Sequence, residues 1–136
     1  KRTALKIAYV GTHFHGFQRQ PNVRTVEEEL IYHLRKLDYI DDLKKSRFRI
    51  AGRTDAGVHS LGNVISFQSE KEVRVNEINN SLPDDIQILA SAPVRYAFKP
   101  RYAQMRQYRY MLFQDLDIDR LRQCAEVFKG THNFTN

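Results

Sequence analysis

The chain has 136 residues, 41% of them hydrophobic, which is enough for an ordinary globular domain with a buried core and excludes a disordered chain. Its 22 Lys and Arg outweigh its 16 Asp and Glu, and the net charge of +6 suits a polyanionic partner such as nucleic acid, although a solvated basic surface accounts for it equally well. A single cysteine excludes an internal disulfide, and no apolar run approaches the roughly 18 residues of a membrane span, so we expect a soluble, cytoplasmic protein without a membrane anchor.

The N-terminal third of the chain predicts a strand, a loop and a helix. Residues 4–10 alternate as a strand, and the loop over 11–22 is rich in Gly, His and Gln, so its backbone could approach a ligand closely. Thr25 and Glu28 form a capping box. The helix that follows has its apolar face on Val26, Leu30, His33, Leu34 and Leu37.

The next segments complete one domain. Strands are predicted over 47–51 and over 63–68, where Ile65 and Phe67 face inward, and a helix over 75–82 ends at Pro83. A further strand contains residues 86–90. The resulting order, βαββαβ, predicts an α+β fold with an antiparallel sheet, of the ferredoxin-like and RNA-recognition type, over residues 1–102.

The remaining residues, 103–136, predict the incomplete beginning of a second, similar domain. Residues 107–113 alternate as a fifth strand, and Asp117 or Asp119 caps a helix on which Cys124 is expected to be a small core residue. One strand and one helix cannot close a layer by themselves, so more of this domain is expected beyond them.

The loop between the strands at 47–51 and 63–68 has the strongest chemical signal. Asp55 lies between Gly52 and Gly57 and two residues after Arg53, so a carboxylate would be presented at the tip of a turn beside a cation that favours its ionised form. The segment is also ordinary turn chemistry, in which Asp bonds its own backbone and Gly supplies a positive φ. Spacing alone leaves both interpretations open.

Five segments, taken together, are more specific than any one of them. They are 9–21 with Thr25-Val26-Glu27 after it, 52–59 (Gly-Arg-Thr-Asp-Ala-Gly-Val-His), 80–86, 108–110 (Tyr-Arg-Tyr) and 128–134. In this order they resemble the TruA family of tRNA pseudouridine synthases, and 52–59 matches the family's catalytic loop. The resemblance favours the functional interpretation of Asp55.

The chain also departs from the family pattern. The loop between Phe113 and Leu116 is shorter than usual, and the C-terminal half of a family member, with a further basic active-site residue, is absent after Asn136, so we expect only part of the enzyme here. Single-residue departures, none of which lies in the catalytic motif, are Val10, Phe17, Ser60 and Asn63.

The resemblance implies an isomerase that converts uridine to pseudouridine in the anticodon stem and loop of tRNA. Asp55 would be the nucleophile, attacking either the ribose or the uracil ring, and Arg53 would orient it or contact a phosphate. Tyr108 would stack on the uracil and assist proton transfer at C5; without the resemblance it is a core aromatic. Residues expected to bind the substrate are Arg19, Gln20, His59, Lys99, Arg101 and Arg106.

Cofactors and partners follow from the same reasoning. We expect no cofactor and no metal, since His13 and His15 could supply two ligands but no third stands near them. The family is typically homodimeric. An alternative function is a non-catalytic RNA-binding module of the same fold, whereas an aspartate hydrolase would need a second carboxylate or a metal beside Asp55.

Overall fold

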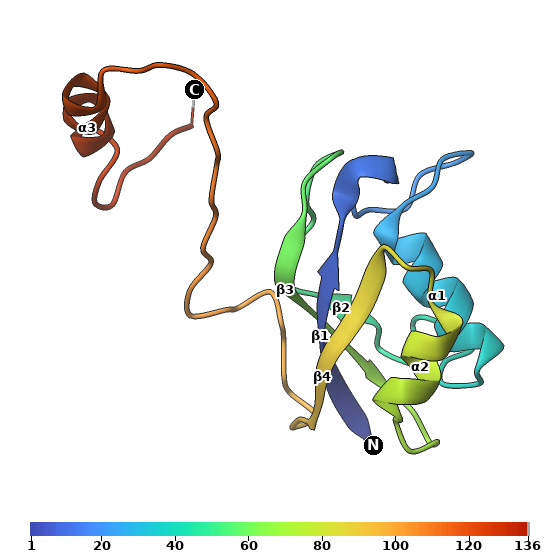
Figure 1. The fold of residues 1–136 in the computed structure, drawn as a ribbon. Helices are drawn as coiled ribbons and strands as arrows, with labels where there is room; N and C mark the ends of the chain where they lie inside the picture. The colour runs from blue at the N-terminus through green and yellow to red at the C-terminus, as the bar shows by residue number, and fades with distance from the viewer. Residues whose placement is uncertain (136) are drawn as a thin grey trace. The chain divides into compact units, whose positions relative to one another are not determined.

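The computed structural model describes residues 1–135 and divides into two units, Lys1–Met105 and Arg106–Asn136. The strands and helices of the first unit follow the predicted order βαββαβ (Figure 1). They are β1 (Arg2–Tyr9), a 3-10 turn η1 (Gly11–His13), α1 (Val26–Lys36), β2 (Arg49–Ile50), β3 (Ser60–Gln68), α2 (Val75–Ser81) and β4 (Ile86–Pro93).

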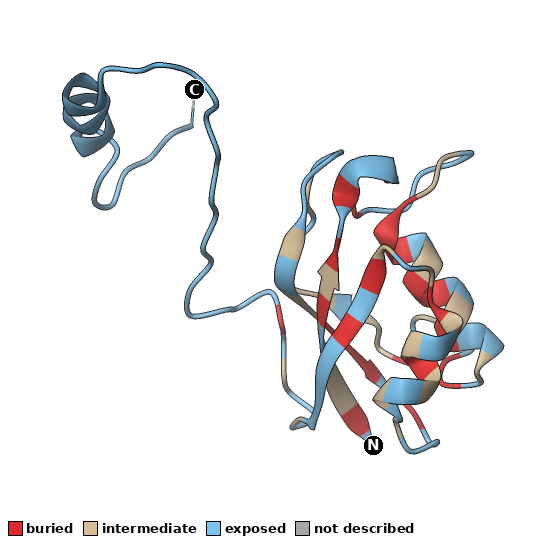
Figure 2. Cartoon of the chain, viewed as in Figure 1, coloured by how far each residue is buried: buried red, intermediate tan, exposed pale blue. Residues whose placement is uncertain are grey.

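The sheet of the first unit has four strands in the order β2-β3-β1-β4, and every neighbouring pair is antiparallel. Helices α1 and α2 cover one face (Figure 1). The α+β architecture with an antiparallel sheet is therefore confirmed. On the covered face, Leu5 lies opposite Ile65, and both are fully buried together with Phe67. Figure 2 shows buried and less buried positions alternating along the second half of β1 and at the start of β4, as expected for a sheet with one covered face, whereas on β3 Ser66 is buried as well as Ile65 and Phe67.

Helix α1 begins where the capping box places it. The Thr25 side chain accepts a hydrogen bond from the backbone N–H of Glu28, at 3.3 Å. Three acidic residues occupy the first turn and basic residues the last, which complements the helix dipole. The helix buries Leu30 and Leu34 against the sheet, and burying a leucine side chain contributes about 1.5–3 kcal/mol.

The strands predicted over 4–10, 63–68 and 86–90 are present as β1, β3 and β4 with limits that differ by up to three residues, and two other strand predictions are wrong. The strand expected over 47–51 contains only Arg49 and Ile50, because Arg47 adopts a left-handed backbone with φ of 49° that cannot continue a strand. Residues 107–113 form no strand: a strand requires a hydrogen-bonded neighbour, and the described part of the second unit supplies none.

The second unit contains helix α3 (Ile118–Glu126). Asp117 is its N-cap, because its side chain accepts a hydrogen bond from the backbone N–H of Arg120 at 3.1 Å. Cys124 is exposed rather than buried, so the prediction of a core position is wrong; no second layer covers α3 within the described part of this unit. No helix among residues 1–135 is long and apolar enough to cross a membrane.

Candidate active site

Asp55 lies on the loop that connects β2 to β3, and its side chain is exposed. The N–H of Val58 donates to the carbonyl of Asp55 at 3.2 Å, which closes a tight turn. Gly57 stands at the third position of that turn with φ of 80°, a conformation that favours glycine. The turn chemistry and the presentation of the carboxylate are thus two aspects of one structure.

Side chains from β1 and β3 hold the base of this loop. The hydroxyl groups of Tyr9 and Thr54 are hydrogen-bonded at 2.7 Å, and Tyr9 is only 3% exposed. The Asn63 amide donates to the carbonyl of Gly52 at 2.7 Å and accepts from the N–H of the same glycine at 3.3 Å. Asn63 also donates to the Tyr9 hydroxyl at 3.4 Å, so the two side chains form one network under the loop.

The segment from Gly11 to Arg24, which we call the opening loop, packs directly against the Asp55 loop. A Cβ atom at Gly11 would lie 2.1 Å from the carbonyl oxygen of Val58, and one at Gly16 would lie 3.1 Å from that of Thr54. The N–H of Phe17 donates to the same Thr54 carbonyl at 3.0 Å. The backbone approach therefore requires glycine at position 11.

His59 also joins the two loops. Its Nδ1 accepts a hydrogen bond from the backbone N–H of Gly11 at 2.9 Å. In a neutral ring this places the proton on Nε2. The sequence predicts that His59 binds the substrate; in the structure this exposed residue contacts the opening loop through Nδ1, so Nε2 is the ring atom that could bind a ligand.

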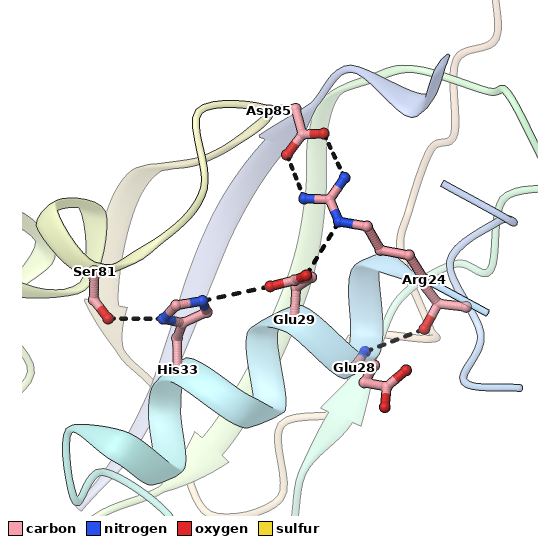
Figure 3. Close-up of polar contacts among 7 residues, drawn as sticks. Arg24, Glu28, Glu29, His33, Ser81 and Asp85 are labelled. Atoms are coloured by element: carbon pink, nitrogen blue, oxygen red, sulfur yellow. Dashed lines mark hydrogen bonds and ion pairs between the residues drawn. The ribbon is translucent and has the colours of Figure 1, made fainter. Parts of the chain in front are cut away.

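Arg24 anchors the end of the opening loop (Figure 3). Its guanidinium donates two hydrogen bonds to Asp85, at 2.7 and 2.9 Å, and one to Glu29 at 3.1 Å. Glu29 in turn lies 3.4 Å from Nε2 of His33, whose Nδ1 is 2.7 Å from the Ser81 hydroxyl. The bond to Asp85 raises the pKa of Arg24, and the pKa of Asp85 is lowered by the same bond. The network connects the opening loop, both helices and the start of β4.

Further contacts fix both ends of the opening loop. The Arg24 guanidinium lies over the Phe14 ring, 4.1 Å from its centroid, and the Arg24 carbonyl accepts from the N–H of His15 at 2.8 Å. At the other end, the N–H of Val10 donates to the Asp85 carbonyl at 3.0 Å. Asp85 therefore holds the start of the loop by its backbone and the end by its side chain.

A hollow of about 430 Å³ brings three of the predicted residues together. Arg19, Gln20 and Arg53 line it with Glu27. Nε of Arg19 donates to the Glu27 carboxylate at 2.8 Å, and this holds the guanidinium at the rim. Two cations against one carboxylate leave the hollow positive, as a phosphate site requires. A larger hollow of about 570 Å³ lies along α2 and contains no predicted site residue.

Arg53 and Asp55 are not joined by an ion pair in residues 1–135. The exposed Arg53 side chain lines the hollow, and its orientation of Asp55 stays a prediction. The position of Arg53 favours the alternative role, contact with a phosphate. Within the same residues no group of His, Cys, Asp or Glu side chains is arranged to hold a metal.

The other predicted residues lie outside these contacts. Lys99 and Arg101 belong to the first unit and lie 5.7 and 5.2 Å from the centroid of the Tyr102 ring. Arg106 and Tyr108 belong to the second unit, and the Tyr108 side chain is 76% exposed. The predicted site residues are thus divided between the two units.

The family model described as tRNA pseudouridine synthase matches residues 6–103, which include the opening loop, the Asp55 loop and the whole β3–α2–β4 segment. The chain belongs to the tRNA pseudouridine synthase family. Curated relatives named tRNA pseudouridine synthase A share this similarity along the full chain and place it in the TruA branch.

Three archaeal relatives show the extent of the match. The protein of Methanobrevibacter smithii is 85% identical over 137 residues, covering all of this chain and 47% of the relative. That of Methanothermobacter thermautotrophicus is 51% identical and 50% covered, and that of Thermococcus sibiricus is 51% identical and 52% covered. The chain spans about half the length of the curated relatives it matches.

Within this pseudouridine synthase domain, sequence reasoning missed the residues that support the loop. The Asn63 side chain and the backbone N–H of Phe17 both bond to the catalytic motif. For Asn63 a signal was available, because a polar residue alternates with Ile65 and Phe67 on the inward face of β3 and needs a buried partner. Arg24 and Asp85 are 61 residues apart, and no local pattern indicates their pairing.

Proposed function

We propose that the full-length protein is a tRNA pseudouridine synthase that isomerises uridines in the anticodon stem and loop of tRNA. One observation carries the proposal: an exposed Asp55 on a rigidly supported turn in a domain of this family, beside a positive hollow lined by Arg19 and Arg53. We also propose that the first unit has a ferredoxin-like fold and that residues 103–136 are the start of a second, similar domain.

The reaction needs a nucleophile but no redox partner. The bond between ribose C1′ and uracil N1 breaks, the base turns, and a bond forms between C1′ and C5; C5 loses a proton and N1 gains one, so the product is an isomer. A carboxylate such as Asp55 can form and release a covalent bond without prior deprotonation at neutral pH. Attack at ribose C1′ and attack at uracil C6 both remain open for it.

The surrounding residues would hold the RNA while the base is exposed. The target uridine must leave its stack, which costs a few kcal/mol, and base–aromatic stacking contributes about 1–3 kcal/mol in return. We assign that stacking, and help with the proton at C5, to Tyr108. Arg19, Gln20 and Arg53 would bind a phosphate in the hollow, His59 Nε2 would donate to the substrate, and Lys99, Arg101 and Arg106 would contact further phosphates. Homodimerisation and a cytoplasmic location stay predictions.

The test follows tritium release from tRNA transcripts labelled at uridine C5, with the full-length protein. Wild type should release tritium; Asp55→Ala should release none and still bind tRNA. Asp41→Ala is a matched control, because Asp41 is an exposed aspartate on another loop, and it should behave as wild type. If folded wild-type protein binds tRNA but releases tritium from no transcript, the RNA-binding module is the better description.

A further inference from the structure

Three arginines converge on the sheet face that the helices leave uncovered. Arg49 on β2 lies opposite Ser66 on β3, and Arg2 on β1 lies opposite Gln68, so Arg2 and Arg49 share a face with Ser66. Leu5 and Ile65 point to the other face, under the helices. Nη2 of Arg2 donates to the Ser66 hydroxyl at 3.1 Å, which places its guanidinium between β1 and β2.

Arg47, two residues before β2, belongs to the same cluster of arginines. Its guanidinium lies 4.0 Å from the centroid of the Tyr96 ring, and Tyr96 is 63% exposed. Burial and the charges of Arg47 and Arg49 lower the pKa of Arg2, with a smaller opposing effect of Tyr96. The charges of Arg47 and Arg49 are therefore both unfavourable for the Arg2 cation.

The cluster has no counter-charge in the part of the chain that the structure describes. None of Arg2, Arg47 and Arg49 forms an ion pair there. Arg2 is only 7% exposed, and its buried Nε has no hydrogen-bond partner among these residues. A buried, unsatisfied donor on a charged group is unfavourable, so an anion at this place would relieve both the repulsion and the missing bond.

We propose that Arg2, Arg47 and Arg49, with Tyr96, form a second phosphate-binding site, which holds the RNA backbone away from the target uridine; this rests on the proposed function. Guanidinium groups bind phosphate oxygens in a fork, and the exposed Arg49 and Tyr96 leave the cluster open to a polymer. Ser66 is six residues along β3 from Ser60, where the Asp55 loop ends, so these two positions are about 20 Å apart at roughly 3.3 Å per residue.

The test compares a double variant, Arg47→Asn with Arg49→Gln, with a control that loses the same charge. Asn tolerates the left-handed backbone of position 47, so the fold should be retained. The control, Arg35→Gln with Lys36→Gln, removes two exposed cations from α1, across the sheet. Each full-length protein is tested with a complete tRNA transcript and with a short hairpin that contains the target loop and three base pairs.

For the double variant we expect KM for tRNA to rise on the order of ten-fold, with kcat unchanged, and the slope of log affinity against log salt to fall by about 1 to 2. The hairpin should bind equally to all three proteins, because it is too short to reach both sites. Wild-type affinity and salt slope in the double variant, or an equal loss in the control, would overturn the proposal.

Two further outcomes separate the phosphate site from the proposed function and from a site for a free anion. If the double variant weakens tRNA binding but wild type releases no tritium, the proposed function fails and the phosphate site stands. If tRNA binding is unchanged but added inorganic phosphate stabilises wild type against heat and not the double variant, the cluster binds a free anion and the RNA proposal is wrong.

Discussion

Replacing Tyr9 by Phe should slow catalysis more than it weakens substrate binding. The change removes the 2.7 Å bond to the Thr54 hydroxyl and the longer bond from Asn63. One neutral hydrogen bond contributes about 0.5–1.5 kcal/mol, and leaving Thr54 without its partner adds to the loss, so the support of the Asp55 loop weakens by about 1–2 kcal/mol. If the whole loss falls on the position of Asp55 in the transition state, kcat decreases roughly 5- to 30-fold with KM unchanged.

The assay is tritium release from labelled tRNA, with the free energy of unfolding measured in parallel. Tyr39→Phe is the matched control: Tyr39 is 2% exposed, against 3% for Tyr9, and its hydroxyl accepts from the backbone N–H of Arg74 at 3.1 Å, away from the Asp55 loop. Both variants should lose similar stability, and only Tyr9→Phe should lose kcat. A wild-type kcat in Tyr9→Phe, or an equal decrease in both variants, would refute the role of Tyr9 in positioning the loop.

Three further changes test other parts of the structure. Gly11→Ala should destabilise the domain by more than about 2 kcal/mol in chemical denaturation, whereas Gly57→Ala, whose Cβ meets nothing within 4 Å, should lose only the ~1 kcal/mol of its positive φ. Arg24 lowers the pKa of Asp85, so the ion pair stabilises the fold above the unfolded pKa of Asp85, about 4, and this stabilisation is lost as the pH falls through the folded pKa. In Arg24→Met, the free energy of unfolding should therefore decrease less between about pH 5 and 2 than in wild type. Arg101→Ala should lower the salt slope of tRNA binding by about 1, and an unchanged slope would remove it from the RNA contacts.

The parts of the fold that the sequence predicted are those with local causes. Thr25 caps α1 because local chain geometry brings its hydroxyl within hydrogen-bond distance of the N–H three residues later. Ile65 and Phe67 are buried because residues two apart in a strand lie on the same face. The start of β2 was predicted wrongly because Arg47 has a left-handed backbone. This cause is also local, but the hydrophobic periodicity of the sequence does not reveal it.

The support of the candidate site depends on long-range pairs instead. Tyr9 and Thr54 are 45 residues apart, and Tyr9 has the pattern of any inward-facing strand residue. Family resemblance indicated Asp55 as the candidate nucleophile, because catalytic motifs are short and contiguous, but the residues beneath the loop are distributed over β1, the opening loop and β3. Their roles follow only from the register of the strands.

The central place of β1 has a consequence for how the domain is made. β1 pairs with β3 on one side and β4 on the other, yet it precedes both in the chain. During synthesis its hydrogen-bonding groups have no partner until β3, which begins 51 residues after β1 ends, leaves the ribosome. At about 5–20 residues per second this is roughly 3 to 10 s. The strand that supports the Asp55 loop through Tyr9 therefore has unpaired edges in the nascent chain, and unpaired strand edges are prone to misassociation.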